Sequence, residues 1–225
     1  MTQIKSRQRV ADHGEVFTRP QEVNAMIDMV IRAKGLPLVN KHGEAEMPDE
    51  STVLEPACGD GNFLIEILKR KLSYVANQNK RKPRIHYDYR LIVALSSLYG
   101  IDLLQDNVLR CRERLLNFAE SEYQRLFECE MSAQLKNVVE YILKLNILHG
   151  DALKMVYADS LNQPIDEHFL HFSQWAAVSF PRAFCLSRKE YQYAHLIQTE
   201  SRSHYQFINA YRSTYFMDIQ DAKPE

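Results

Sequence analysis

The strongest structural signal in this chain is the segment Glu55-Pro56-Ala57-Cys58-Gly59-Asp60-Gly61-Asn62-Phe63. It follows Thr52, Val53 and Leu54, which predict a short strand that is stopped by the proline. The apolar residues after it have helical spacing and are Phe63, Leu64, Ile67, Leu68 and Leu72. The two glycines between strand and helix let the backbone approach a ligand closely. The segment therefore predicts a strand, a glycine turn and a helix, which together form half of a βαβ unit.

Similar patterns on both sides predict further elements. A helix is expected from Val23, and residues 98–102 and 146–149 read as the second and third strands. A basic polar insert is expected at 77–90, followed by a short buried helix at 91–98. Beyond Leu161 we expect an aromatic-rich segment with a helix through Tyr191, Tyr193, Tyr205, Phe207 and Tyr211.

Strands that alternate with helices predict an α/β fold with a mainly parallel sheet and helices on both faces. The ligand crevice of such a sheet lies at the carboxyl ends of its strands, where Glu55, Asp102 and Asp151 are expected. We expect residues 1–160 to form the ligand-binding domain, shortened at its C-terminal side, and residues 161–225 to form an aromatic-rich extension.

Composition excludes several classes of protein. Of the 225 residues, 45% are hydrophobic and 25% are charged, which disfavours disorder, collagen and coiled coil. The formal net charge of -1 argues against an autonomous DNA-binding domain, so any DNA contact must be local or shared. No apolar run approaches the ~20 residues of a transmembrane helix, and the polar N-terminus predicts a cytoplasmic protein. The four cysteines are too widely spaced to predict a zinc site or a disulfide framework, and no metal is expected.

The glycine turn by itself allows more than one interpretation. A dinucleotide-binding fingerprint would have a third glycine at position 64, where the chain has Leu64, so nicotinamide chemistry is disfavoured. An ordinary tight turn stays open as an alternative to a ligand-binding loop.

Four motifs together resemble a known family. Residues 55–63 resemble the cofactor-binding motif of adenine-N6 DNA methyltransferases, and residues 14–20 resemble the upstream element of the same enzymes. Residues 99–102 and 146–153 are similar to their second and third cofactor-side motifs. The resemblance covers roughly residues 14 to 155. It implies a class I (Rossmann-like) methyltransferase fold that binds S-adenosylmethionine at the switch point of the sheet.

The resemblance also assigns roles to individual positions. Phe17 and Thr18 would meet the methionine moiety, Asp102 would accept hydrogen bonds from the ribose hydroxyls, and Asp151 would hold the adenine amino group. For each aspartate, a role as a helix cap or turn residue is the alternative. The full set of implied cofactor-binding positions is Phe17, Thr18, Glu55, Pro56, Gly59, Asp60, Gly61, Phe63, Asp102 and Asp151.

Two features depart from the family pattern. The interval from Gly61 to Asp102 is about twice the ~20 positions of a simple βαβ unit, because of the basic insert. Its Lys80, Arg81, Lys82 and Arg84 could contact DNA phosphates, although a solvated loop is favoured. More seriously, the chain lacks the family's Asn-Pro-Pro-Tyr element, and Ser179-Phe180-Pro181-Arg182 is only a distant approximation. The catalytic residues are therefore unassigned.

The C-terminal aromatic residues offer a limited substitute. Trp175, Tyr191 and Tyr193 could stack on a nucleic-acid base, worth about 1 to 3 kcal/mol each, but a packed helix edge is the favoured interpretation. His195 and His204 lie nearby without a metal-ligand spacing, and we expect them to face solvent.

The sequence thus predicts an S-adenosylmethionine-dependent DNA methyltransferase of the restriction-modification type, which transfers a methyl group to adenine N6. Transfer would be direct and in line, without a covalent enzyme intermediate. DNA binding is expected to need a partner subunit or a target-recognition protein. The main alternative is a catalytically degenerate S-adenosylmethionine-binding subunit of a restriction or defence complex. A methyltransferase that acts on a small molecule or a protein is a third hypothesis.

Overall fold

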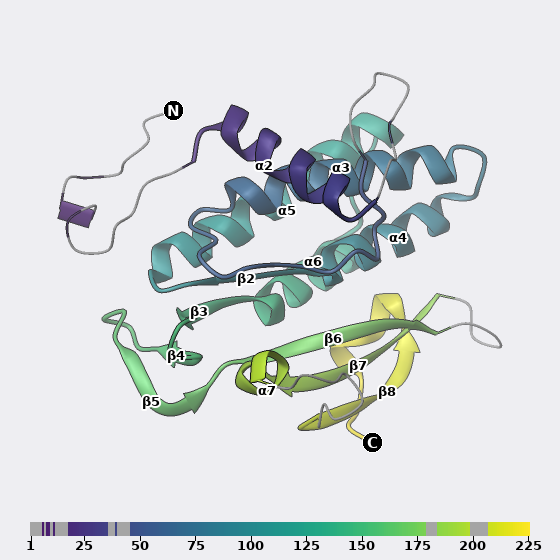
Figure 1. Cartoon of the computed structure of the whole chain (residues 1–225). Helices are drawn as coiled ribbons and strands as arrows, with labels where there is room; N and C mark the ends of the chain where they lie inside the picture. Colours follow the sequence, from purple (N-terminus) through teal and green to yellow (C-terminus); the bar gives the residue numbers. More distant parts are fainter. Residues whose placement is uncertain are drawn as a thin grey trace.

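The computed structural model describes residues 6, 8, 9, 11, 18–35, 39, 46–178, 184–198 and 207–225. The first part of the fold alternates helices with strands (Figure 1). Its elements are α2 (Pro20–Ala33), β1 (Val53–Glu55), α3 (Asn62–Asn79), α4 (Arg84–Ser96), β2 (Leu98–Asp102), α5 (Gln105–Phe127), α6 (Ala133–Asn146) and β3 (Ile147–Asp151). The three strands and the helices after β1 and β2 confirm the α/β pattern predicted from the sequence.

The first sheet has five strands in the order β1-β2-β3-β4-β5. Strands β1, β2 and β3 are parallel, with Leu54 opposite Tyr99 and Gly100 opposite Ile147. The short strand β4 (Val156–Ala158) pairs antiparallel with both β3 and β5 (Pro164–Phe169). The sheet is therefore parallel through its first three strands and ends in an antiparallel hairpin.

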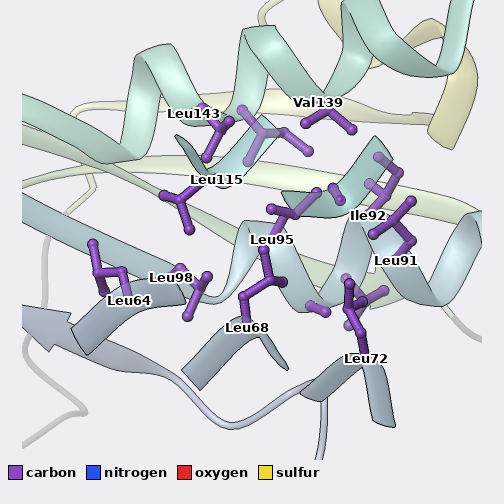
Figure 2. Close-up of a cluster of buried hydrophobic side chains, with 14 of the residues drawn as sticks. Leu64, Leu68, Leu72, Leu91, Ile92, Leu95, Leu98, Leu115, Val139 and Leu143 are labelled. Carbon is purple, nitrogen blue, oxygen red and sulfur yellow. The ribbon is translucent and has the colours of Figure 1, made fainter. Parts of the chain in front are cut away.

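The five long helices pack together against β2 and β3. Leu98 of β2 and Ile147 of β3 belong to a buried cluster to which α2, α3, α4, α5 and α6 all contribute. Figure 2 shows part of this cluster, including Leu64, Leu68, Leu95 and Leu115, which is enclosed among the helices. No helix in the described part of the chain is long and apolar enough to cross a membrane.

The other face of the sheet is covered mainly by strands. Tyr99, Ile101 and Leu148 pack against Leu170, Phe172 and Tyr193, and no residue of the five long helices belongs to this second buried cluster. The structure thus meets the expectation of helices on both faces only in part, because this face carries strands and only the short helix α7 (Tyr193–Gln198). The reason is that β1, β2 and β3 follow one another in a single direction, so that right-handed crossovers place their helices on the same side.

The basic insert is structured rather than a loop. Helix α3 continues to Asn79 and α4 already begins at Arg84, so only residues 80–83 connect them. The side chains of Tyr87 and Asp88 are buried, and the Tyr123 hydroxyl donates a hydrogen bond to Asp88. The predicted basic residues are exposed around this turn, as Lys80, Arg81, Lys82 and Arg84.

The C-terminal part forms a second sheet. It contains β6 (His171–Val178), β7 (Cys185–Gln192), the short helix α7 (Tyr193–Gln198), β8 (Asn209–Tyr215) and the 3-10 helix η2 (Phe216–Asp221). The sheet has the order β6-β7-β8 and lies on the opposite side of β2 from α2–α5 (Figure 1). The predicted long helix is therefore wrong except at α7, which begins at Tyr193. Tyr191 lies in β7, Tyr211 lies in β8, and Tyr205 is outside the described residues. Leu186, Phe216 and Ile219 join the helical core, so the two sheets share one interior.

A buried lysine fastens the segment that leads into β1. The Lys71 side chain of α3 is fully buried, and its Nζ donates hydrogen bonds to the carbonyl oxygen of Asp49 at 2.9 Å and to Ser97 Oγ at 2.6 Å. It also donates to the carbonyl oxygen of Ser51. Burial lowers the pKa of Lys71 to about 7. The ammonium group therefore links α3, the chain before β1 and the chain before β2.

This lowered pKa predicts a pH dependence of stability. Because Lys71 has an ordinary pKa of 10.5 when unfolded and about 7 when folded, the unfolded chain binds more protons between these values. Stability contributed by this group must then rise with pH, by about 1.5 kcal/mol between pH 7 and 8.5. Urea unfolding at several pH values should show this rise, and Lys71→Met should remove it. Equal pH slopes in both proteins would contradict the prediction.

Candidate functional site

Three acidic residues lie at the same edge of the first sheet. Glu55 ends β1, Asp102 ends β2 and Asp151 ends β3, and these parallel strands are neighbours. The strand registers place Asp102 two residues beyond the level of Glu55, and Asp151 two residues beyond the level of Asp102, so the three acidic residues form a staggered border across the strand ends. The structure thus places the three acidic residues at the carboxyl ends of neighbouring parallel strands, as the sequence predicted.

The glycine loop lies on top of β2. The Cys58 amide donates to the carbonyl oxygen of Ile101 at 2.9 Å, and the Gly59 amide donates to Asp102 Oδ2 at 2.9 Å. Gly59 and Gly61 have φ values of +53° and +94°, a left-handed conformation that favours glycine. The sequence of the loop is therefore explained by a tight turn that is attached directly to the neighbouring strand.

Two thiols fill the space beneath the loop. Cys58 and Cys111 are both buried, and a hydrogen bond between them together with burial raises the pKa of the Cys58 thiol. A Cβ atom at Gly61 would lie 2.7 Å from Cys111 Sγ, so the side chain at position 61 has to be absent. Because a thiol with a raised pKa stays neutral, Cys58 is suited to packing rather than to nucleophilic chemistry.

Helix α5 supplies residues that hold the loop in place. The Arg114 guanidinium donates to the carbonyl oxygen of Asp60 at 2.7 Å and to Asn62 Oδ1 at 3.0 Å, and it forms an ion pair with the Asp60 carboxylate at 2.7 Å. Asn107 Nδ2 donates to Asp102 Oδ1 at 3.1 Å. Sequence reasoning missed these residues. The available signal was that Asn107, Cys111 and Arg114 are spaced to share one helix face.

Asp102 acts as a turn residue, which is the alternative role that the sequence left open for it. Its Oδ2 accepts from the Gly59 amide, while its Oδ1 accepts from the Leu104 amide at 2.9 Å and from Asn107. The carboxylate therefore connects the glycine loop to the start of α5.

Asp151 and Glu55 accept fewer internal hydrogen bonds than Asp102 does. Asp151 Oδ1 accepts from the amides of Leu153 and Lys154 at 2.8 and 2.9 Å, and Glu55 Oε1 accepts from the Ala57 amide at 3.3 Å. Within the described part of the chain, the second oxygen of each carboxylate has no hydrogen bond. Burial raises the pKa of the Glu55 carboxyl. These two oxygens are therefore the available acceptors at the site.

The turn between β4 and β5 forms a wall beside β3. Asn162 Oδ1 accepts from the Gln105 amide at 2.9 Å and lies 3.0 Å from His149 Nε2. His149 Nε2 is also 2.9 Å from the carbonyl oxygen of Leu103. This contact was not predicted, because it joins residues from three separate segments through tertiary structure.

The remaining predicted site residues lie in different surroundings. The carbonyl oxygen of Thr18 accepts a bond from Asn62 Nδ2 at 3.5 Å, which places the start of α2 beside the loop. Pro56 is exposed, whereas Phe63 packs against the main core. Phe17 lies outside the described residues, as do the approximate motif at 179–182 and His204. His195 is exposed, as expected.

Among the described residues, no group of three or more histidine, cysteine, aspartate or glutamate side chains could hold a metal ion. Among the described strands, β1 forms one edge of the sheet and the strand order never reverses. The expected switch point is therefore not formed by these strands. No protein-family model matches the chain, and no curated protein or solved structure matches it either.

Proposed function

We propose that this protein is an S-adenosylmethionine-dependent DNA methyltransferase of the restriction-modification type, which methylates adenine at N6 in the cytoplasm. The observation that carries the proposal is the border formed by Glu55, Asp102 and Asp151 around a loop with two left-handed glycines. Clefts at the carboxyl ends of parallel strands are the usual ligand sites of open α/β sheets. The motif resemblance of residues 14–155 gives this general site its particular cofactor.

The hydrogen-bond acceptors at the site fit this cofactor. Carboxylate oxygens only accept hydrogen bonds, which suits the two hydroxyls of a ribose and the exocyclic amine of adenine. Asp102 would hold the ribose and Asp151 the amine, while the backbone of Gly59 to Gly61 would border the cofactor. When bound, S-adenosylmethionine supplies a methyl group that is made electrophilic by the sulfonium charge. The neutral Cys58 thiol favours direct transfer without a covalent enzyme intermediate.

One observation favours a second candidate function. The 225-residue sequence contains no Asn-Pro-Pro-Tyr element, and a poor nucleophile such as the adenine amino group needs preorganised acceptors around it. The chain would then be an S-adenosylmethionine-binding subunit of a restriction or defence complex that does not turn over alone. In either case we expect DNA contact to need a partner subunit or a target-recognition protein.

A methyl-transfer assay separates the two functions. Purified protein is incubated with S-adenosylmethionine carrying a labelled methyl group and an adenine-containing duplex, alone and with the products of neighbouring genes. Label should enter the duplex but not a control duplex that already carries N6-methyladenine. Transfer by the chain alone supports the enzyme, and transfer only with an added protein supports the subunit. Absence of S-adenosylmethionine binding in calorimetry would contradict both.

A further inference from the structure

A cavity of about 420 Å³ lies at the end of α3 that is farthest from the glycine loop. Tyr74 and Gln78 line it from α3, His86 lines it from α4, and Val178 and Phe184 line it from the ends of β6 and β7. Its volume falls within the range of about 300–1,000 Å³ that is typical of ligand sites. Because the 18 residues of α3 span about 27 Å, this cavity is separate from the strand-end border.

The turn between α3 and α4 gives the cavity a positive charge. Residues 78–87 contain four lysine and arginine residues and no acid, although the whole chain has a formal net charge of -1. Lys82 lines the cavity, and its neighbours Lys80 and Arg81 are exposed in the same turn. Within the described part of the chain, none of these three residues forms an ion pair. A concentration of uncompensated charge of one sign favours a ligand of the opposite sign, here an anion.

A second cation of the lining, Arg90, is already compensated. Its guanidinium donates to Glu50 Oε1 at 2.9 Å and also to the Asp49 carboxylate. The two ion pairs hold the arginine in place and neutralise its charge. Lys82 is therefore the residue to which we assign the anionic group of a ligand.

Aromatic rings form another part of the wall. The Phe184 ring packs edge-on against His86, with 5.0 Å between ring centroids, and against Tyr89 at 5.4 Å. Tyr74 differs from these residues, because within the described part of the chain it has neither a ring contact nor a hydrogen bond. Gln78 follows it by four residues on the same helix face, and its exposed amide can both donate and accept. The lining thus combines a ring, an amide and a lysine that are all available to a ligand.

We propose that this cavity binds a nucleotide, with its phosphate at Lys82 and its base against Tyr74. A phosphate provides the negative charge that the lysine favours, and a lysine ammonium commonly binds phosphate groups. A planar base suits an aromatic wall and can form hydrogen bonds with the Gln78 amide. A free nucleotide and a nucleotide within a nucleic-acid single strand offer the same chemistry. The proposal does not depend on S-adenosylmethionine binding, so either can fail alone.

Calorimetric titration of the full chain tests the proposal. The probes are thymidine 5′-monophosphate, thymidine and inorganic phosphate. Thymine has no exocyclic amine, which is the group assigned to Asp151, so these probes do not report on the proposed cofactor site. Thymidine 5′-monophosphate should bind at least about 10-fold more tightly than either other probe, because it alone uses both the lysine and the ring. Equal affinity for inorganic phosphate, or no binding of the nucleotide, would overturn the proposal.

Variants locate the binding. Lys82→Gln and Tyr74→Leu should each weaken thymidine 5′-monophosphate about 10-fold, by loss of the charge and of the ring. Lys69→Gln is the matched control, because Lys69 is an exposed lysine of the same helix that pairs with Glu66 at 3.8 Å outside the cavity. Circular dichroism checks that each variant is folded. Losses of equal size in Lys69→Gln and Lys82→Gln would indicate a general effect of charge and would overturn the proposal.

An oligonucleotide of five thymidylates distinguishes the two sources of the nucleotide. If a single strand is the ligand, the oligonucleotide should bind at least about 10-fold more tightly than the mononucleotide, with an affinity that falls as salt is raised, because Lys80 and Arg81 can contact further phosphates. Equal affinities identify a free nucleotide as the ligand. Both results support the proposal only if Lys82→Gln weakens binding. Oligonucleotide binding that is unchanged in both Lys82→Gln and Tyr74→Leu would overturn it.

Discussion

Asp102→Ala is expected to weaken S-adenosylmethionine binding about 100-fold in isothermal titration calorimetry. The proposed role of Asp102 is to accept two hydrogen bonds from the ribose hydroxyls through an ionised carboxylate. Hydrogen bonds to a charged group contribute about 1.5 kcal/mol each or more, and a loss of about 3 kcal/mol corresponds to that change in affinity. The residue also positions Gly59, since the two are joined at 2.9 Å, so the loss includes a looser loop.

The control must separate binding from folding. Removing the Asp102 carboxylate leaves the amides of Gly59 and Leu104 without their acceptor, which costs about 1–3 kcal/mol of stability. Binding is therefore measured at a temperature where the variant is still folded by circular dichroism. Glu113→Ala is the matched control, because Glu113 is an exposed carboxylate on α5, the helix after Asp102, and forms an ion pair with Arg110 at its surface. A folded Asp102→Ala protein that binds within 3-fold of the parent would contradict the assignment.

The central strands were predictable because their signals are local. Strand β2 was predicted at residues 98–102 and occupies the same residues, since an apolar run ends at a glycine and an acidic residue. The placement of Glu55, Asp102 and Asp151 followed from one rule, namely that parallel strands end at a common edge. For these elements, residues that are close in sequence are sufficient to predict the structure.

The errors arose where tertiary contacts outweigh local pattern. The charged residues of 77–90 suggested a loop, but Tyr87 and Asp88 turn inward and are buried by α5 through Tyr123. In the C-terminal part, aromatic residues spaced for a helix form strands instead, because Arg188 of β7 lies opposite Trp175 and contacts the ring face of Tyr211 at 3.6 Å. That pairing joins distant segments and leaves no local trace in the sequence.

In the site, too, residues with local signals were predictable and residues placed by tertiary contacts were not. The glycine loop and strand-end acids were visible in the sequence, whereas Cys111 and Arg114 became meaningful only once α5 was placed under the loop. The packing of the long helices into one shared cluster could not be predicted either, because it depends on strand order and not on helix pattern. Among the described strands, the same order leaves β1 at an edge, so the expected switch point is not formed there.

Gly61→Ala is expected to destabilise the protein by about 3 kcal/mol in urea unfolding. Its φ of +94° costs a side-chain-bearing residue about 1–2 kcal/mol. The new Cβ would also lie 2.7 Å from Cys111 Sγ, and such overpacking costs about 1–3 kcal/mol more. Because the strained loop borders the proposed cofactor site, S-adenosylmethionine affinity should fall together with stability.

Two further variants separate these contributions. Gly35→Ala is the matched control for backbone strain, since Gly35 has a φ of +64° and nothing within 4 Å of an added Cβ. It should lose only about 1 kcal/mol. In the Gly61→Ala and Cys111→Ala double variant, the contact with sulfur is absent, so the two substitutions should be less costly together than their sum by about 1–2 kcal/mol. Additive losses would show that backbone strain alone requires glycine at position 61 and that the thiol beneath the loop has no part in shaping it.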